Sequence, residues 1–270
     1  MENLVILFRK QDHSYDKEIE VASKYFNVVL SRAHAPKDSL VIGRYSVLPF
    51  YKELEEDLAY NNSRLINTYR MHRYMADISS WYDDFEDITP RTWFRLQDIP
   101  NNTSFVLKGE TNSKKYNWST HMFAKDKEAA GRVYSNLMND SLIGNQNICI
   151  REYVQLRQLD LDVSGLPITE EYRFFILYGK VVSSGFYWSS HYELQEAHNL
   201  NPNQVPTSFL EDVCSRLEGR ANAVVVDIAR TAKGDWVVVE LNDFQQSGLS
   251  ENDPEVLYKN MSKVLNGSST

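Results

Sequence analysis

The sequence predicts an α+β fold that begins with a small α/β unit. Short runs rich in Val, Ile and Leu alternate with helical periodicity before residue 60, as expected of a βαβ unit. Farther along the chain, residues 171–188 and 222–242 each contain two strand-like runs separated by a turn with glycine, which indicates antiparallel hairpins. The 270 residues, 42% of them hydrophobic, are enough to bury the core of one large unit or of two to three small units.

The first 89 residues carry the pattern of one small unit. Three strands and two helices are predicted, the strands at 4–8, 27–30 and 39–43 and the helices at 15–26 and 50–60. Apolar and aromatic residues at mixed helical spacing follow over residues 65–81. Thr89-Pro90 then fits a helix N-cap followed by proline at the first helical position. We therefore predict a domain boundary near residue 90, between units at 1–89 and 90–270.

The remaining residues carry a mixture of strands and helices. Strands are predicted at 104–110 and 148–156, with a helix rich in Ala, Glu and Lys at 125–138 between them. The hairpin at 171–188 breaks at Gly179-Lys180, so the sheet is expected to be largely antiparallel. Ser208-Phe209-Leu210-Glu211 indicates a capping box for a helix that ends at Gly219, and a closing helix is predicted at 254–265.

The composition argues against several classes of protein. A formal net charge of −8 disfavours a protein that coats nucleic acid, because such binding depends on neutralising phosphates. Cys149 and Cys214 have no CxxC neighbour and are expected to be small core residues, and the six histidines show no zinc-ligand spacing. The apolar run in the first ten residues is too short for a signal peptide and no stretch approaches a membrane span, so we expect a cytoplasmic protein.

Three oxygen-bearing side chains stand near the ends of the last two strand-like runs. Asp227 lies in the run at 222–230, and Glu240 and Asn242 lie in the run at 235–242. Residues of matching parity on neighbouring strands share a face, so the three side chains are expected side by side. Two carboxylates and an amide suit Mg²⁺, which also keeps waters and phosphate oxygens. The sequence therefore predicts the Mg²⁺ site of an ATP-using enzyme; the alternative is two surface strand ends.

Three further features fit the same nucleotide. Lys108 ends an apolar strand and would direct an ammonium group toward a phosphate, unless it is a strand-end lysine in solvent. The loop at 109–116 lacks P-loop spacing, but with Lys114 and Lys115 it can close over phosphates, unless it is an ordinary exposed turn. Glu152 lies beside extended backbone and can hold ribose hydroxyls while peptide groups bind the adenine edge; the alternative is a simple edge strand.

Arginines occur in two contexts that call for a partner. Arg173 lies within a largely apolar strand, where a guanidinium is costly unless it meets a carboxylate or a phosphate. A structural salt bridge is the competing interpretation. Farther back, Arg64, Arg70, His72 and Arg73 gather near a predicted helix start, as a solvated helix face or as a patch for an anionic substrate.

The order of these segments resembles the ATP-grasp superfamily of ATP-dependent ligases. The resemblance is closest to its compact branch related to the ribosomal-protein glutamate ligases, found in bacteria and their viruses. It follows Val106-Leu107-Lys108, Arg151-Glu152-Tyr153-Val154, Glu171-Tyr172-Arg173-Phe174, Asp227 and Val239-Glu240-Leu241-Asn242-Asp243, and is strongest from about residue 104 to 250. It implies an ATP-grasp fold, with two α+β lobes at about 90–150 and 151–270 whose antiparallel sheets grip ATP, preceded by a small α/β pre-ATP-grasp unit.

The resemblance also implies a role for each matching residue. The implied ATP contacts are Lys108, Lys114, Lys115, Glu152, Tyr153 and Val154, with Arg91 at the place where many members of the superfamily carry an earlier lysine. The implied catalytic residues, which stabilise the transferred phosphoryl group, are Arg173 and Lys108. The implied Mg²⁺ ligands are Asp227, Glu240 and Asn242.

The implied reaction joins a carboxylate to an amine. The carboxylate would attack the γ-phosphate of ATP to form an acyl phosphate, and the amine would then displace phosphate to leave an amide and ADP. The acceptor is expected to be a small molecule, a peptide or a protein. Arg44, Gln246 and Ser247 are the candidates for holding it, since both segments would face the cleft in this architecture. Each can instead be structural, with Arg44 pairing a carboxylate.

Two alternatives keep the ATP site and change the activity. An RNA-end ligase acting in RNA repair would join a 5′-phosphate, with Arg64, Arg70, His72 and Arg73 and the abundant tyrosines guiding a single strand. The acidic net charge counts against this hypothesis. A non-catalytic ATP sensor is the other alternative, although a sensor would not need the complete Asp, Glu and Asn set.

Overall fold

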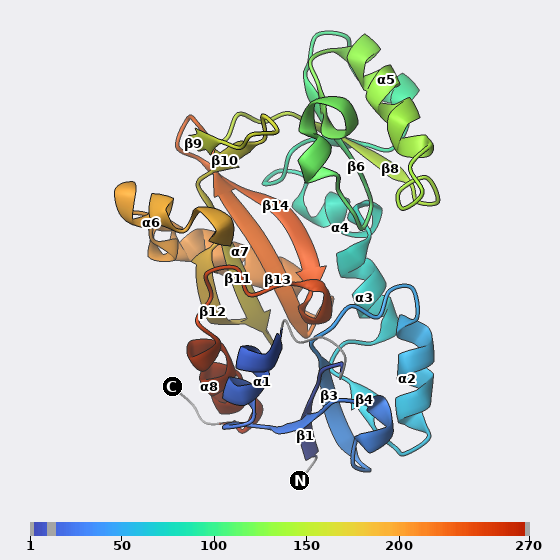
Figure 1. Ribbon diagram of the computed structural model, residues 1–270, viewed down its shortest axis with the longest axis vertical. Helices are drawn as coiled ribbons and strands as arrows, with labels where there is room; N and C mark the ends of the chain where they lie inside the picture. The colour runs from blue at the N-terminus through green and yellow to red at the C-terminus, as the bar shows by residue number, and fades with distance from the viewer. Residues whose placement is uncertain (1–2, 10–14, 268–270) are drawn as a thin grey trace.

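The computed structural model describes residues 3–9 and 15–267, and it arranges three four-stranded sheets and one small hairpin along the long axis of the molecule (Figure 1). The N-terminal sheet lies at one end, a central antiparallel sheet lies in the middle, and a second antiparallel sheet lies at the other end. The α+β prediction is therefore confirmed.

The N-terminal sheet is parallel, with strand order β2-β1-β3-β4. Its strands are β1 (Asn3–Leu7), β2 (Asn27–Val29), β3 (Ser39–Gly43) and β4 (Arg64–Leu65), and its helices are α1 (Asp16–Ala22) and α2 (Tyr51–Ala59). The strands β1 and β3 are almost fully buried, as expected of a parallel sheet covered by helices. The βαβ pattern of the sequence thus forms as predicted.

Two short helices lead from this unit into the rest of the chain. They are α3 (Tyr69–Ala76) and α4 (Ile78–Phe85). The sheet that follows is antiparallel in the order β5-β8-β6-β7, with strands β5 (Thr92–Trp93), β6 (Phe105–Gly109), β7 (Phe123–Ala124) and β8 (Ile148–Glu152). Helix α5 (Lys127–Met138) packs on this sheet through Ala130, Val133 and Leu137.

The central sheet is antiparallel throughout, in the order β12-β11-β13-β14. Its strands are β11 (Glu171–Leu177), β12 (Lys180–Phe186), β13 (Ala223–Arg230) and β14 (Trp236–Asp243). A small hairpin precedes it, formed by β9 (Gln158–Leu161) and β10 (Pro167–Thr169). Its helices are α6 (Glu193–Ala197), α7 (Thr207–Leu217) and α8 (Pro254–Leu265).

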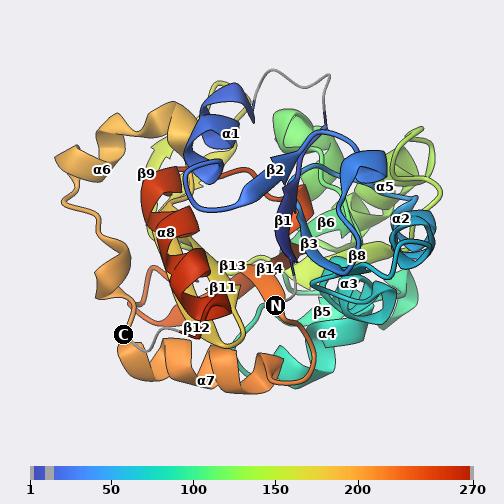
Figure 2. The ribbon, with the colours of Figure 1, turned by 90° about the horizontal axis from the view of Figure 1, so that it is seen from below.

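Apolar side chains cover both faces of the central sheet. On one face, Phe174 and Val226 pack with Trp81 of α4 and Val213 of α7. On the other face, residues of β11 and β13 pack with α8 and with the N-terminal sheet, to which β1 and β3 contribute. Figure 2 shows α1 of the N-terminal unit beside α8. Because strand side chains alternate between faces, the nearly continuous apolar runs of β11 and β13 serve both cores.

Two local predictions about helix starts are wrong. No helix follows Thr89-Pro90, because the Thr89 hydroxyl donates to the carbonyl of Val238 at 2.7 Å and accepts from Arg151. The helix predicted to begin at a Ser208 capping box begins at Thr207, and no side chain caps it. The predicted end of that helix is correct, since Gly219 has a φ of 71° in the left-handed region.

The remaining sequence features are placed as follows. Cys149 is buried on β8 and Cys214 is partly buried on α7, and both are free thiols, as expected of small core residues. Within residues 3–9 and 15–267, no helix combines the length and the apolar character that crossing a membrane requires. The boundary proposed near residue 90 falls in the connection between α4 and β5.

Candidate active site

The register of the central sheet brings three predicted site residues into one row. Asp227 on β13 pairs with Glu240 on β14 on one side and with Arg173 on β11 on the other. Asn242 pairs with Val225, two positions farther along both strands, so its side chain lies on the same face as Glu240. The parity argument made from the hairpin is therefore confirmed for all three oxygen donors.

Arg173 is held by a bidentate ion pair. Its Nε and Nη2 each donate to one carboxylate oxygen of Asp227 at 2.8 Å, and its Nη1 donates to the carbonyl of Gly248 at 2.9 Å. Asp227 is 1% exposed. Burial alone would lower the pKa of Arg173, but the Asp227 carboxylate raises it, so the guanidinium is charged and fixed in orientation.

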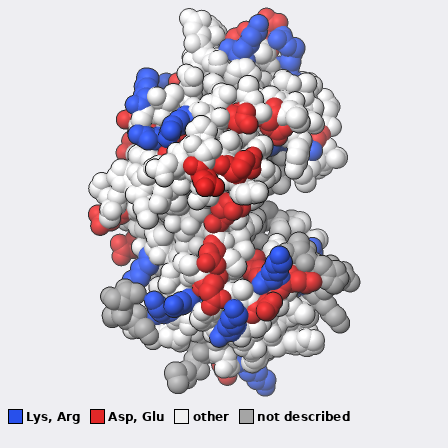
Figure 3. All heavy atoms as spheres, turned by 60° about the vertical axis from the view of Figure 1, so that its left-hand side comes forward, with Lys and Arg blue, Asp and Glu red and all other residues white. Residues whose placement is uncertain are grey.

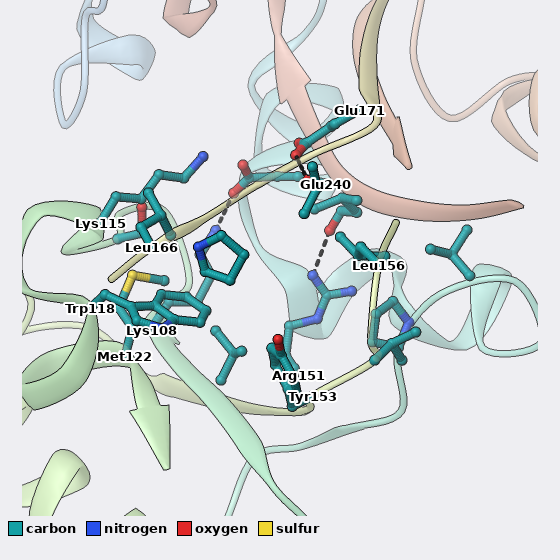
Figure 4. A pocket seen from close by; sticks show the side chains of 18 of the residues that line it. Lys108, Lys115, Trp118, Met122, Arg151, Tyr153, Leu156, Leu166, Glu171 and Glu240 are labelled. Atoms are coloured by element: carbon teal, nitrogen blue, oxygen red, sulfur yellow. Dashed lines mark hydrogen bonds and ion pairs between the residues drawn. The ribbon is translucent and has the colours of Figure 1, made fainter. Parts of the chain in front are cut away.

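Lys108 joins the two antiparallel sheets at the same place. It lies on β6, is 7% exposed, and its ammonium donates to a carboxylate oxygen of Glu240 on β14 (Figure 4). Burial alone would raise the pKa of Glu240, but Lys108, with Lys115 and Arg173, lowers it to about 2. Glu240 is therefore ionised at neutral pH and lies among three cations.

A pocket opens between these sheets. Apolar side chains line much of it, among them Val106, Trp118, Met122, Leu156, Leu166, Val237 and Val239. The extended segment Glu152-Tyr153-Val154 forms part of the wall, and Lys108, Lys115, Glu171 and Glu240 line its polar end (Figure 4). Among the residues that the structure describes, the peptide groups of Val154 make no backbone hydrogen bond. An apolar slot beside such a segment suits a planar base with a hydrogen-bonding edge.

The two lysines of the loop at 109–116 lie in different places. Lys115 lines the pocket, and its Nζ donates to the hydroxyl of Tyr187 at 2.6 Å. Lys114 instead forms an ion pair with Asp140 at 2.7 Å and does not line the pocket. The structure therefore favours Lys115 as the loop lysine that reaches the nucleotide.

Arg44 does not face the pocket. It is 1% exposed, its Nε donates to Glu18 at 2.8 Å, and its Nη1 donates to the carbonyls of Phe244 and Ser247. The prediction that Arg44 holds the acceptor directly is corrected, because its role is the competing one of pairing a carboxylate. Ser247 is also buried, with its hydroxyl donating to the carbonyl of Asp243 at 3.0 Å. Gln246 between them is partly buried.

Arg91 and the N-terminal arginine patch also lie outside the pocket. Arg91 is exposed, with its guanidinium 5.0 Å from the centroid of the Trp93 ring. His72 is fully buried and stacks on Tyr51 at 4.1 Å, so it cannot join Arg64, Arg70 and Arg73 in a surface patch. On the face shown in Figure 3, acidic side chains run down the middle. The structure gives the RNA hypothesis no continuous basic surface in this region.

Sequence reasoning missed three polar residues of the site. Arg151 on β8 is buried, and it donates to the hydroxyl of Thr89 at 2.7 Å and to the carbonyl of Val239, so it ties β8 to β14. The argument applied to Arg173 would have found it, since it also ends an apolar run. Glu171 lines the pocket at the start of β11, and Tyr187 contacts Lys115. Only the carboxylate beside an apolar strand gave a signal in the sequence.

The burial of Glu171 leads to a pH-dependent stability. Glu171 is 4% exposed, and burial, opposed by Lys115, raises its pKa to about 7. Between pH 4.5 and 7 the unfolded chain releases this proton while the folded chain keeps it, so the contribution of Glu171 to stability falls as pH rises. Above about pH 7 this cost is constant.

Replacing Glu171 with Gln removes the titrating group. Relative to the wild type, we expect Glu171→Gln to gain stability steadily from pH 4.5 to 7, by up to about 3 kcal/mol. Urea unfolding of both proteins at several pH values, with a chelator present, measures the difference. A difference that does not change with pH would contradict the assigned cause.

The donor set around Glu240 fits a magnesium ion. Glu240 and Asn242 offer a carboxylate and an amide on one face, both only partly buried, beside a pocket of nucleotide size and polarity. Asp227 would share its oxygens with Arg173, which already binds both. Within the described part of the chain, no group of three His, Cys, Asp or Glu side chains is placed to hold a metal, so the amide is needed to complete the set.

Comparison with known proteins places the fold in a family. Residues 96–261 match a family of the ATP-grasp domain, family 3 of its RimK-related clade. No curated protein matches the sequence significantly.

Solved structures extend the likeness over nearly the whole chain. The D-cycloserine synthetase DcsG superposes with a TM-score of 0.61 at 13% identity, covering 97% of this chain and 99% of that one. A RiPP-associated ATP-grasp ligase from Chryseobacterium gregarium, in complex with ADP and a leader and core peptide, has a TM-score of 0.61 at 11% identity, with 100% and 98% covered. A RimK domain ATP-grasp protein from Sphaerobacter thermophilus has a TM-score of 0.58 at 17% identity, with 95% and 98% covered.

At these identities the solved structures establish a shared fold. The family match spans more than half of the chain and includes Lys108, Arg173, Asp227 and Glu240. The chain therefore belongs to family 3 of this clade of ATP-grasp domains, which confirms its assignment to the ATP-grasp superfamily of ATP-dependent ligases.

Proposed function

We propose that this chain is a Mg²⁺-dependent ligase that uses ATP to join a carboxylate to an amine and releases ADP and phosphate. The observation that carries the proposal is the meeting of Lys108 with Glu240 at the polar end of an apolar pocket, beside the Arg173–Asp227 pair. The site thus combines cations for a polyphosphate with a slot for a base.

The proposed position of ATP follows from the character of each wall. The adenine lies between the apolar side chains, with its edge against the peptide groups of Val154. Glu152 accepts hydrogen bonds from the ribose hydroxyls. The phosphates then extend toward Lys108 and Lys115, where opposite charge and exclusion of water favour them.

The chemistry needs positioning and charge neutralisation rather than a protein nucleophile. A substrate carboxylate oxygen attacks the γ-phosphorus as the bond to ADP breaks, and Arg173 and Lys108 offset the charge on the transferred group. An amine then attacks the acyl carbon, phosphate departs, and the amine proton passes to solvent. When bound, Mg²⁺ would neutralise phosphate oxygens, held by Glu240, Asn242 and Asp227. Closure of the loop at 109–116 keeps water away from the activated carboxylate.

The acceptor is proposed to be a small molecule, a peptide or a protein. Two of the similar solved structures are described with peptides, the Chryseobacterium gregarium ligase and the macrocyclase MdnC bound with its precursor peptide MdnA. These support peptides as the first acceptors to try. A cytoplasmic location, where ATP is available, is part of the same proposal.

A screen for ADP release tests the proposed function. The full chain with ATP and Mg²⁺ is incubated with amino acids, peptides or 5′-phosphorylated RNA, and ADP and the joined product are measured. ADP formation that depends on an amine and a carboxylate supports the ligase. Stimulation by RNA ends alone, or saturable ATP binding with no turnover on any acceptor, would overturn it in favour of the RNA-end ligase or the sensor.

Lys108→Ala is expected to weaken nucleotide binding at least about tenfold, because it removes a charged donor from a water-poor site. Isothermal titration with a non-hydrolysable ATP analogue and Mg²⁺ measures the affinity. Lys125→Ala provides the matched control, since Lys125 is exposed in the same lobe and does not line the pocket. Equal affinities for the two variants would remove Lys108 from the ATP site.

A further inference from the structure

Tyr187 lies where two cations of the site come together. It directly follows β12, and its peptide N–H donates to the carbonyl of Glu171 at 3.0 Å, so the sheet fixes its backbone. The Nζ of Lys115 is 4.3 Å from the centroid of the Tyr187 ring and donates to its hydroxyl. The guanidinium carbon of Arg173 is 4.8 Å from the same centroid. One side chain therefore contacts both a loop lysine and a sheet arginine.

An aromatic ring can hold cations without neutralising them. Its face attracts Lys115 and Arg173 through the ring quadrupole, and this attraction grows when water is excluded. A carboxylate in the same place would hold the cations more strongly, but its charge would repel a phosphate. Asp227 and Glu240 already offset much of the positive charge at the site. The ring thus keeps two cations close together and still attractive to an anion.

The hydroxyl of Tyr187 has a separate task. Lys115 belongs to the loop at 109–116, whereas Tyr187 and its neighbour Trp188 belong to the segment that directly follows the central sheet strand β12. Trp188 also contacts Lys115, with Nζ 5.0 Å from its ring centroid. The bond from Lys115 to the Tyr187 hydroxyl therefore holds the loop against the opposite wall of the pocket.

We propose that Tyr187 is a positioning residue that directs Lys115 and Arg173 toward the transferred phosphoryl group and keeps the loop at 109–116 closed. The inference rests on the proposed function and adds a residue that sequence reasoning did not select. The hydroxyl acts through Lys115 alone, whereas the ring acts through both cations. Substitutions at this one position can therefore separate the two effects.

Tyr187→Phe and Tyr187→Leu form the test. With a non-hydrolysable ATP analogue and Mg²⁺, we expect affinity to fall about fivefold in Tyr187→Phe, which loses the hydroxyl, and about a further fivefold in Tyr187→Leu, which also loses the ring. Trypsin cleaves after lysine, so mass spectrometry of timed digests reports how often the loop opens at Lys114 and Lys115. Both variants should be cut there faster than the wild type.

A double-variant cycle separates positioning from general loss of structure. If the hydroxyl acts through Lys115, Tyr187→Phe should change nucleotide affinity little when Lys115→Ala is already present. Once an acceptor is known, Tyr187→Leu should also lower kcat, through Arg173, more than Tyr187→Phe does. Tyr192→Phe is the matched control, because Tyr192 is exposed and the substitution removes the same hydroxyl from the surface.

The outcomes distinguish this inference from the proposed function. If folded Tyr187→Leu, checked by thermal unfolding, binds the analogue as the wild type does and its loop is cut at the wild-type rate, the inference is overturned. Independent, additive effects of Tyr187→Phe and Lys115→Ala would overturn it as well. If the wild type itself fails to bind the analogue, the proposed function fails instead.

Discussion

Glu240→Gln is expected to lower ADP formation at least about a hundredfold while leaving the fold intact. The substitution keeps the size of the side chain and removes a full negative charge, because the pKa of Glu240 is held at about 2 and the group is ionised at neutral pH. Lys108 then loses its carboxylate partner, and the proposed metal site loses one of its two carboxylates. Initial rates of ADP release at saturating ATP measure the effect.

The control for this substitution lies on the surface. Glu193 on α6 is exposed, and Glu193→Gln removes the same charge away from the pocket. Thermal unfolding and circular dichroism establish that both variants are folded. Turnover by Glu240→Gln at the rate of Glu193→Gln would remove Glu240 from the chemistry and with it the proposed metal site.

Arg173→Ala is expected to reduce both stability and turnover. It leaves the carboxylate of Asp227 buried without its cation, which costs about 3–5 kcal/mol in the free energy of unfolding. It also removes the cation proposed to act on the transferred group, so kcat should fall more than affinity for ATP. Urea unfolding gives the first quantity, and rates corrected for the folded fraction give the second.

Two companion variants separate these effects. Arg132→Ala breaks an exposed ion pair with Glu128 on α5 and should change stability by less than about 1 kcal/mol. Arg173→Lys keeps a charge beside Asp227 but loses the planar fork, so it should recover much of the stability and less of the rate. Equal loss of ATP affinity and kcat in Arg173→Ala would assign Arg173 to binding rather than to the transferred group.

The hairpin that carries the acidic residues was predictable because it is local. Its two strands are neighbours in sequence, so turn position and side-chain parity were enough to place Glu240 opposite Asp227 and Asn242 on the same face. The N-terminal βαβ unit and the closing helix were predictable for the same reason. Each depends on periodicity within a short stretch of chain.

Contacts between distant segments were beyond this reasoning. Lys108 and Glu240 are 132 residues apart, and only the packing of two sheets brings them together. The pairing of β11 with β13, which places Arg173 beside Asp227, depends on the order of strands in the sheet. The orientation of Arg44 was equally inaccessible, since a strand-end arginine can point to solvent, to a substrate or into the core. Its burial beside Glu18 decides between these.

The bonds of Glu18 bear on how the protein can be divided. One carboxylate oxygen of Glu18 accepts from Arg44 and, at 2.6 Å, from the hydroxyl of Tyr258, and both partners are buried. Helix α1 and helix α8 are thus joined from opposite ends of the sequence. The family match begins only at residue 96, yet a fragment excised at that boundary would expose one side of its central sheet to water. Such a fragment would be prone to self-association, so the catalytic lobes and the preceding unit are best regarded as one cooperative folding body.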